Sequence, residues 1–213
     1  MSTDSLIRQL STGLLPIRRR NIAQETFWLA SLGTLELALF LGLGLMRSDM
    51  AQALGHPFMW WKLGSLAALV VISVTTALRS FSPTASPRKG LLLIGSVIGL
   101  IALAGALVDP SQTDSASVLT RLEPLHGLAC ATCIVVLSLP MVIMLSIFMR
   151  KGASTHPEAT AAVVGLAGGS WGALVFAFCC PMNDPLYVFV WYALACSTLA
   201  LMARMLLPRL TTL

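Results

Sequence analysis

Cysteine residues gather at two points of this chain, and their spacing could support metal or redox chemistry. Cys130 and Cys133 form a C-x-x-C pair, and Cys179 and Cys180 are adjacent. His126 precedes Cys130 by four residues, so the two share one face of a helix. Thiolate and imidazole bind soft or borderline metal ions, whereas a thiol pair in an oxidising compartment can form a reversible disulfide. The residues alone leave both chemistries open.

The same side chains could instead serve packing alone, because a buried free cysteine behaves as a small hydrophobe. This interpretation suits the fifth cysteine, Cys196, which lies alone within an apolar stretch. Four cysteines and a histidine near the ends of two such stretches are compatible with either packing or chemistry.

The composition indicates a membrane protein. Of 213 residues, 56% are hydrophobic and only 11% are charged, and the mean hydropathy is +0.83. Soluble domains have about a quarter of their residues charged. A single small domain cannot bury this much apolar surface without lipid. The net charge of +5 is explained by membrane topology, and no nucleic-acid-binding motif is evident, so we expect no direct nucleic-acid partner.

Six apolar stretches have roughly the length of about 20 residues that a helix needs to cross the hydrocarbon core. Lipid offers no partners to open backbone groups, so the spans must be helices. We therefore expect an all-α polytopic membrane protein with six transmembrane helices. The expected spans are Phe27–Met46, Phe58–Leu78, Leu91–Val108, Leu125–Met149, Ala161–Cys180 and Leu186–Leu207.

Basic residues predict the orientation of these spans. Eleven Lys and Arg residues fall on one side and three, Arg47, Lys62 and Arg121, on the other. Cytoplasmic loops carry the excess of Lys and Arg, so both termini are expected in the cytoplasm. The chain then divides into an amino-terminal cytoplasmic segment (1–26), a membrane domain (27–207) and a cytoplasmic tail (208–213). The four paired cysteines face outward in this topology.

The amino-terminal segment has the pattern of a short amphipathic helix. Asp4 is a candidate cap, and Leu6, Ile7 and Leu10 fall on one stripe. Such a helix could lie on anionic lipid, or its apolar stripe could bind a cytoplasmic partner. Both alternatives stay open.

Polar and small residues inside the spans make further predictions. Glu36 lies midway along the first span, where a carboxylate is costly, and we expect it to hydrogen-bond a neighbouring helix. Pro140 should kink the fourth span. The fifth span carries two small-xxx-small pairs that predict close helix packing, namely Gly165 with Gly169 and Gly168 with Gly172.

Several of these motifs together resemble the NrsF family of bacterial membrane proteins. The resemblance covers nearly the whole chain and is strongest from 126 to 207. It rests on the glycine-rich fifth span and on a set of short motifs, which are Thr3-Asp4-Ser5-Leu6-Ile7 with Leu10, Cys130 followed by Pro140, Arg150-Lys151-Gly152-Ala153 with Pro157, Cys180-Pro181-x-x-Asp184-Pro185-Leu186-Tyr187-Val188, and Trp191-Tyr192.

The resemblance implies an inner-membrane anti-sigma factor that is not an enzyme and needs no cofactor. Such proteins hold an extracytoplasmic-function (ECF) sigma factor at the membrane and release it under stress, including heavy-metal or oxidative stress. The family's characteristic cysteines correspond to Cys130 and Cys180, whereas Cys133 and Cys179 are additional. The resemblance does not decide between a metal ion, with His126 as a further candidate ligand, and a disulfide.

Two other classes of function remain as alternatives. A membrane thiol oxidoreductase would cycle Cys130 and Cys133 against Cys179 and Cys180. A transporter for metal ions or small solutes would need more intramembrane charge than Glu36, and no inverted repeats with broken helices are evident.

Overall fold

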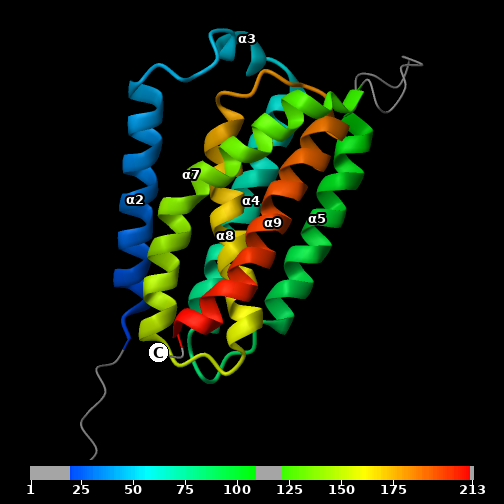
Figure 1. Ribbon diagram of the computed structural model, residues 1–213. Helices are drawn as coiled ribbons and strands as arrows, with labels where there is room; N and C mark the ends of the chain where they lie inside the picture. Colours follow the sequence, from blue (N-terminus) through cyan, green and yellow to red (C-terminus); the bar gives the residue numbers. More distant parts are fainter. Residues whose placement is uncertain (1–19, 109–120, 212–213) are drawn as a thin grey trace, which may run out of the picture.

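The computed structural model describes residues 20–108 and 121–211, and within these ranges the chain is helical with no strand. Successive long helices run in opposite directions along the bundle, as the expected spans require (Figure 1). The elements are α2 (Ile22–Gly42), α3 (Met50–Ala53), α4 (Pro57–Ser80), α5 (Arg88–Val108), α7 (Pro124–Lys151), α8 (Pro157–Ala177) and α9 (Pro185–Thr211).

The all-helical class is confirmed, and five described helices are long and apolar enough to cross a membrane: α4, α5, α7, α8 and α9. The other long helix, α2, has 21 residues, as α5 does, but carries both Glu25 and Glu36. α2 is not among the five candidate spans. That α2 forms a sixth span remains a prediction.

The first long helix lies earlier in the chain than the expected span Phe27–Met46. It begins at Ile22 because the Asn21 side chain caps it, with Oδ1 accepting a hydrogen bond from the Gln24 N–H at 3.3 Å. It ends at Gly42, and Gly44 then takes a left-handed conformation with φ of +72°. Residues 22–26, expected in the cytoplasmic segment, therefore form the first turns of α2.

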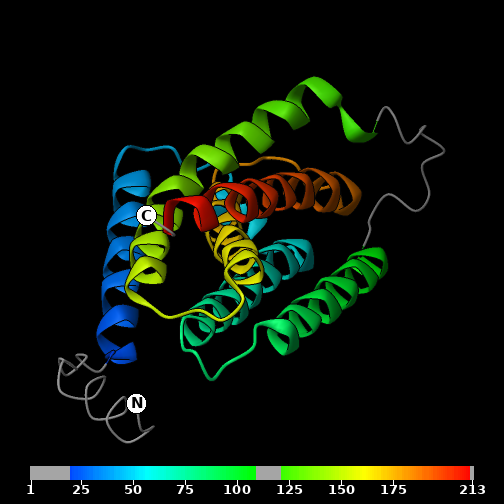
Figure 2. The same cartoon turned by 60° about the horizontal axis from the view of Figure 1, so that its bottom comes forward.

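Two other boundaries also differ from the expected spans. The helix α8, which corresponds to the fifth expected span, ends at Ala177, so Cys179 and Cys180 lie in a loop and not in the helix. Pro181 accounts for part of this difference, since it supplies no backbone N–H and disfavours helical geometry at the residue before it. The last helix continues through Pro208 to Thr211, so most of the expected tail is helical. α7 contains Pro140 and is visibly bent (Figures 1 and 2).

The helix α8 forms the centre of the bundle, packed against α4, α7 and α9 (Figure 2). Of its 21 residues, 14 are buried. A Cβ added to Gly165 would lie 2.5 Å from the Leu199 carbonyl oxygen, and one added to Gly172 would lie 2.5 Å from the Ile134 carbonyl oxygen. The small residues therefore bring α8 against the backbones of α9 and α7, and the predicted close packing is confirmed.

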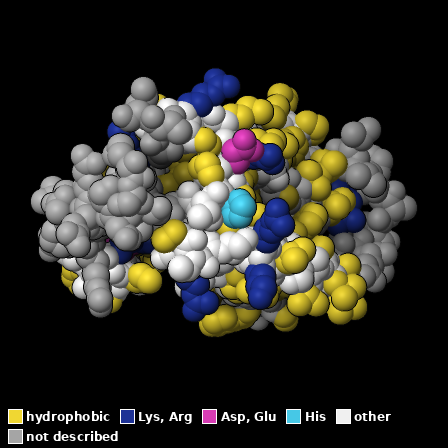
Figure 3. Space-filling model, turned by 90° about the horizontal axis from the view of Figure 1, so that it is seen from below, with side chains coloured by type: hydrophobic (Ala, Val, Ile, Leu, Met, Phe, Trp, Pro, Cys, Tyr) yellow, Lys and Arg dark blue, Asp and Glu magenta, His cyan; other side chains and the backbone are white. Residues whose placement is uncertain are grey.

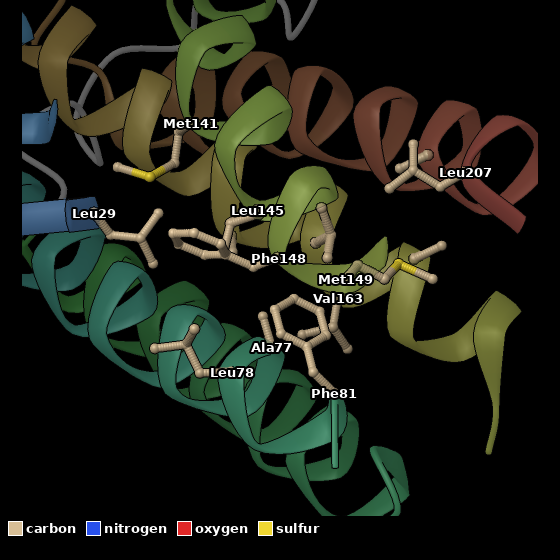
Figure 4. Close-up of a cluster of buried hydrophobic side chains, with 14 of the residues drawn as sticks. Leu29, Ala77, Leu78, Phe81, Met141, Leu145, Phe148, Met149, Val163 and Leu207 are labelled. Carbon is tan, nitrogen blue, oxygen red and sulfur yellow. The ribbon is translucent and has the colours of Figure 1, made fainter. Parts of the chain in front are cut away.

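A large apolar core lies toward the end of the bundle where α4, α7 and α9 terminate (Figure 4). It joins Phe81, which follows α4, to side chains from α2, α4, α5, α7, α8 and α9, including Leu29, Leu145, Val163 and Leu207. This core holds the helices in register, so that the opposite end of the bundle can carry the cysteines.

Candidate functional site

The two cysteine groups meet at the end of the bundle that carries α3. We call residues 178–184, between α8 and α9, the cysteine loop. This loop lies at the same end as the first turns of α7, because α7 enters the bundle where α8 leaves it (Figure 1). The prediction that Cys130 and Cys180 lie toward one end is therefore confirmed.

Cys130 and Cys180 are neighbours in an apolar cluster formed by α4, α7, α8 and α9. Cys180 is fully buried, and Cys130 is partly buried, with Sγ 3.3 Å from the Tyr187 hydroxyl. The buried Tyr192 hydroxyl has Cys180 as a polar neighbour, and it has no hydrogen-bond partner of standard geometry in the described part of the chain. The two thiols thus face a largely apolar space with two phenol groups beside them.

The remaining cysteines occupy different positions. Cys179 is partly buried in the cysteine loop, whereas Cys133 is exposed on α7. Cys196 lies in α9 against Gly169, where an added Cβ would be 3.2 Å from its sulfur. Cys196 therefore packs between helices, as expected, and no described cysteine forms a disulfide.

His126 points away from the thiol pair. Its side chain is 76% exposed, and Nδ1 lies 3.3 Å from the Glu123 carboxylate. Among the described residues, no group of three or more His, Cys, Asp and Glu side chains is placed to hold a metal ion. The pair Cys130 and Cys180 is therefore the part of the predicted ligand set that the fold brings together.

A buried lysine holds the backbone of the cysteine loop. The Lys62 side chain is fully buried, and Nζ donates to the Cys180 and Met182 carbonyl oxygens, each at 3.3 Å. It also lies 5.6 Å from the centre of the Tyr192 ring. No carboxylate pairs with this ammonium among the described side chains. Such burial is expensive unless hydrogen bonds compensate, so the lysine and the loop conformation depend on each other.

An arginine from the connection after α2 binds the same loop. The Arg47 backbone N–H donates to the Phe178 carbonyl oxygen at 3.1 Å. Its guanidinium donates to the Cys180 carbonyl oxygen at 3.3 Å and to Asn183 Oδ1 at 3.2 Å. Two further bonds of 2.6 Å reach the Asp49 carboxylate. These bonds hold the pKa of Asp49 below its ordinary value.

The third basic residue at this end, Arg121, pairs with Asp184 through two hydrogen bonds of 2.7 Å. Asp184 also caps α9, because it accepts a hydrogen bond from the Leu186 N–H at 2.8 Å. Arg47, Lys62 and Arg121, the minority in the charge count, thus all bind the cysteine loop. Sequence reasoning missed this role, and the only available signal was their presence on the side where basic residues are scarce.

Trp191 supports the thiol pair from α9. Its Nε1 donates to the Leu122 carbonyl oxygen at 2.8 Å. Gly127 lies against the Trp191 ring so closely that an added Cβ would overlap it. This contact fixes the first turns of α7, and therefore Cys130, against α9.

The arrangement allows two reactions of the thiol pair. Two thiols from different elements can be bridged by one soft cation or joined as a disulfide after two-electron oxidation. Either change would alter the position of α7 relative to the cysteine loop, whose backbone is tied to α4 and to the connection after α2. Each thiol must lose its proton and become a thiolate before it binds a metal ion.

The other predicted residues lie elsewhere. Glu36 accepts a hydrogen bond from Trp171 Nε1 at 2.9 Å, so the predicted bond to a neighbouring helix is present between α2 and α8. The predicted partner-binding residues Asp4, Leu6, Ile7 and Leu10 lie outside the described residues.

Fold and site together define a helical membrane protein with a thiol pair at one end of its bundle. The family model described as negative regulator of sigma F (NrsF) matches residues 10–212, and the chain belongs to this family. It is 29% identical over 206 residues to the anti-sigma-F factor NrsF of Caulobacter vibrioides, with 94% of each chain covered. It is 28% identical over 199 residues to a probable anti-sigma-F factor NrsF of Azospira oryzae, with 91% of each covered. No solved structure gives a significant match.

Proposed function

We propose that this chain is an inner-membrane anti-sigma factor that binds an ECF sigma factor and releases it when Cys130 and Cys180 react. The family match over residues 10–212 supports the regulatory role. The observation that carries the sensing role is the meeting of Cys130 and Cys180 at one end of the bundle.

The distribution of charge supports six spans with both termini in the cytoplasm. Lys and Arg side chains are spread over the end of the bundle opposite the cysteine loop (Figure 3). Eight of the eleven basic residues within the described ranges belong to that end: Arg20, Arg79, Arg88, Lys89, Arg150, Lys151, Arg204 and Arg209. By the positive-inside rule this end is cytoplasmic. The thiol pair then faces the periplasm, where metal ions and oxidants arrive.

The sigma factor binds the amino-terminal segment (1–26), with the basic loops around Arg88–Lys89 and Arg150–Lys151 as a second contact. When Cys130 and Cys180 bind a metal ion together or form a disulfide, the state with low affinity for the sigma factor is favoured. A coupling free energy of about 1–3 kcal/mol changes that affinity about 5- to 150-fold. This is enough to release a partner held at moderate affinity.

The sensing role is tested by replacing Cys130 and Cys180 together with serine. Transcription from a promoter of the cognate sigma factor is measured with and without Cd²⁺ or a thiol oxidant. We expect repression to persist in the double variant and induction to be lost. The double replacement of Cys133 and Cys179 serves as the matched control and should respond normally. Full induction in the Cys130/Cys180 variant would remove these cysteines from the mechanism.

The binding role is tested separately by co-purification of the full-length protein with the sigma factor. Replacing Leu6, Ile7 and Leu10 with serine should abolish co-purification without changing the amount of protein in the membrane. If the complex persists, the docking site must lie on the cytoplasmic loops.

The alternatives predict different behaviour. A thiol oxidoreductase would reduce quinone as its cysteine pairs cycle, and a transporter would move metal ions into proteoliposomes. The anti-sigma proposal predicts neither activity. It is favoured because one named relative is an anti-sigma factor and the other a probable one. The similarity to this chain covers more than nine-tenths of each relative.

A further inference from the structure

The first long helix, α2, contacts the other helices less extensively than any other long helix of the bundle does. Only three of its 21 residues are buried, namely Leu29, Gly33 and Phe40. It stands at the edge of the bundle beside α7 and also contacts α8 (Figures 1 and 2). A groove of about 230 Å³ separates part of α2 from α4, α7 and α8, and Val74 and Met141 help to line it. α2 can therefore shift at a lower packing cost than α8 could.

One end of α2 is tied directly to the cysteine loop. The helix ends at Gly42, and Arg47 follows only five residues later. Arg47 is 9% exposed and bonds the Phe178 and Cys180 carbonyl oxygens and the Asn183 side chain. A five-residue connection spans at most about 18 Å even when fully extended, so Arg47 and the cysteine loop that it binds stay close to the end of α2.

The other end of α2 adjoins the amino-terminal segment. Arg20 precedes the Asn21 cap of the helix, pairs with Glu25 and donates to the Leu78 carbonyl oxygen at 3.1 Å. Its guanidinium also lies 5.0 Å from the centre of the Phe81 ring. Residues 1–19, which contain most of the proposed docking segment, lead into the chain at this point.

A tryptophan on α8 contacts the middle of α2. Trp171 donates to Glu36 at 2.9 Å, and an added Cβ on Gly33 would lie 2.9 Å from the Trp171 ring. The environment of this ring therefore depends on where α2 lies along α8.

We propose that Arg47 is a positioning residue that couples the cysteine loop to α2, and that α2 carries the displacement to the amino-terminal segment. The inference rests on the proposed function, in which that segment binds the sigma factor. Lys62 binds the same Cys180 carbonyl oxygen, but it belongs to α4, which does not lead to the docking segment. Arg47 follows α2 closely in the chain, and α2 leads back to the docking segment.

The test uses the full-length protein labelled with 5-fluorotryptophan and observed by ¹⁹F NMR in micelles. The five tryptophan resonances are assigned by single Trp→Phe variants. Cys180→Met enlarges a fully buried side chain and displaces the loop without any metal ion or sigma factor. Trp191, in the same cluster as Cys180, reports whether the loop has moved, and Trp171 reports the position of α2.

We expect Cys180→Met to shift both the Trp191 and Trp171 resonances. In the Arg47→Met background the Trp191 shift should remain, and the Trp171 shift should fall below half of its original size. Arg47→Met leaves no buried carboxylate behind, because the Asp49 side chain is 49% exposed, and Lys62 still bonds the Cys180 carbonyl oxygen. Arg47→Lys, which keeps a cationic donor, should restore most of the Trp171 shift.

Arg121→Met is the matched control, since it removes another arginine bound to the cysteine loop but one on a different connection. It should leave the Trp171 shift unchanged. An equal Trp171 shift with and without Arg47 would overturn the proposal, because the displacement would then travel within α8 itself. So would the absence of any Trp171 shift when Trp191 responds. These outcomes do not depend on sigma binding, which the reporter and co-purification experiments test separately.

Discussion

The close contact between α8 and α9 at Gly165 can be tested by adding one methyl group. In Gly165→Ala the new Cβ would lie 2.5 Å from the Leu199 carbonyl oxygen and 2.6 and 2.8 Å from Cα and N of Ala200. All three atoms belong to the α9 backbone, so no change of side-chain rotamer can relieve the overlap. The two helices must instead move apart around this point.

The size of the effect follows from these distances. Carbon atoms in ordinary contact lie about 3.5–4.0 Å apart, so the helices must separate locally by about 1 Å. A gap of that size forfeits roughly a quarter to a half of the dispersion attraction across it. Overpacking of this kind costs about 1–3 kcal/mol, and the rigid backbone places the expected cost in the upper part of that range. The higher helix propensity of alanine offsets about 0.5–1 kcal/mol.

Gly95→Ala provides the matched control. Gly95 lies in α5 at a similar number of residues from the same end of the bundle, and nothing lies within 4 Å of an added Cβ. Alanine there should be neutral or stabilise the protein by up to about 1 kcal/mol. The two variants should therefore differ by about 1.5 kcal/mol or more.

The assay is unfolding of both variants and the unchanged protein in one detergent, followed by far-ultraviolet circular dichroism. Gly165→Ala should unfold at a lower temperature or denaturant concentration than the unchanged protein. Equal stability of the two variants would show that α8 and α9 do not pack as described. A more stable Gly165→Ala protein would contradict the reasoning outright.

Three further predictions follow from individual contacts. Trp171→Phe removes the hydrogen bond to Glu36 and should lower stability by about 1–2 kcal/mol in the same unfolding assay. Asp184→Ala, which removes the cap of α9, should cost about 1–2 kcal/mol, whereas Asp184→Asn keeps a capping oxygen and should lose less. In a protein that retains only Cys130 and Cys180, dibromobimane should bridge the two thiols and become fluorescent. A protein that retains only Cys130 and Cys196 should stay dark. Equal fluorescence of the two would show that Cys130 and Cys180 are not a close pair.

The helices were predictable because their signal is local. A run of about 20 apolar residues must become a helix in lipid, whatever its neighbours are. The ends were less predictable, because they depend on capping and on single backbone conformations. The Asn21 cap starts α2 earlier than expected, and Gly44 lies just beyond its end. α8 ends at Ala177, a few residues before Pro181.

The site was predictable only in outline. Alternating spans place Cys130 and Cys180 at the same end, and this result needs no knowledge of packing. Helical spacing also suggested that His126 shares their site, but its side chain is 76% exposed beside Glu123. Spacing shows which residues share a face of one helix, but it does not show which way that face points.

The sequence by itself determined the class of the protein, the approximate positions of its helices and the end of the bundle at which the cysteines lie. Hydropathy is a local property of each segment, and counting the spans gives the direction in which each one runs. Only the tertiary structure decided that Arg47, Lys62 and Arg121 all bind the loop that contains Cys180. Those contacts depend on how the helices rotate and tilt against one another. Rotation and tilt are set by close backbone approach at the glycine-rich faces of α8, and the small-xxx-small pattern predicts that approach without showing which helices it brings against α8.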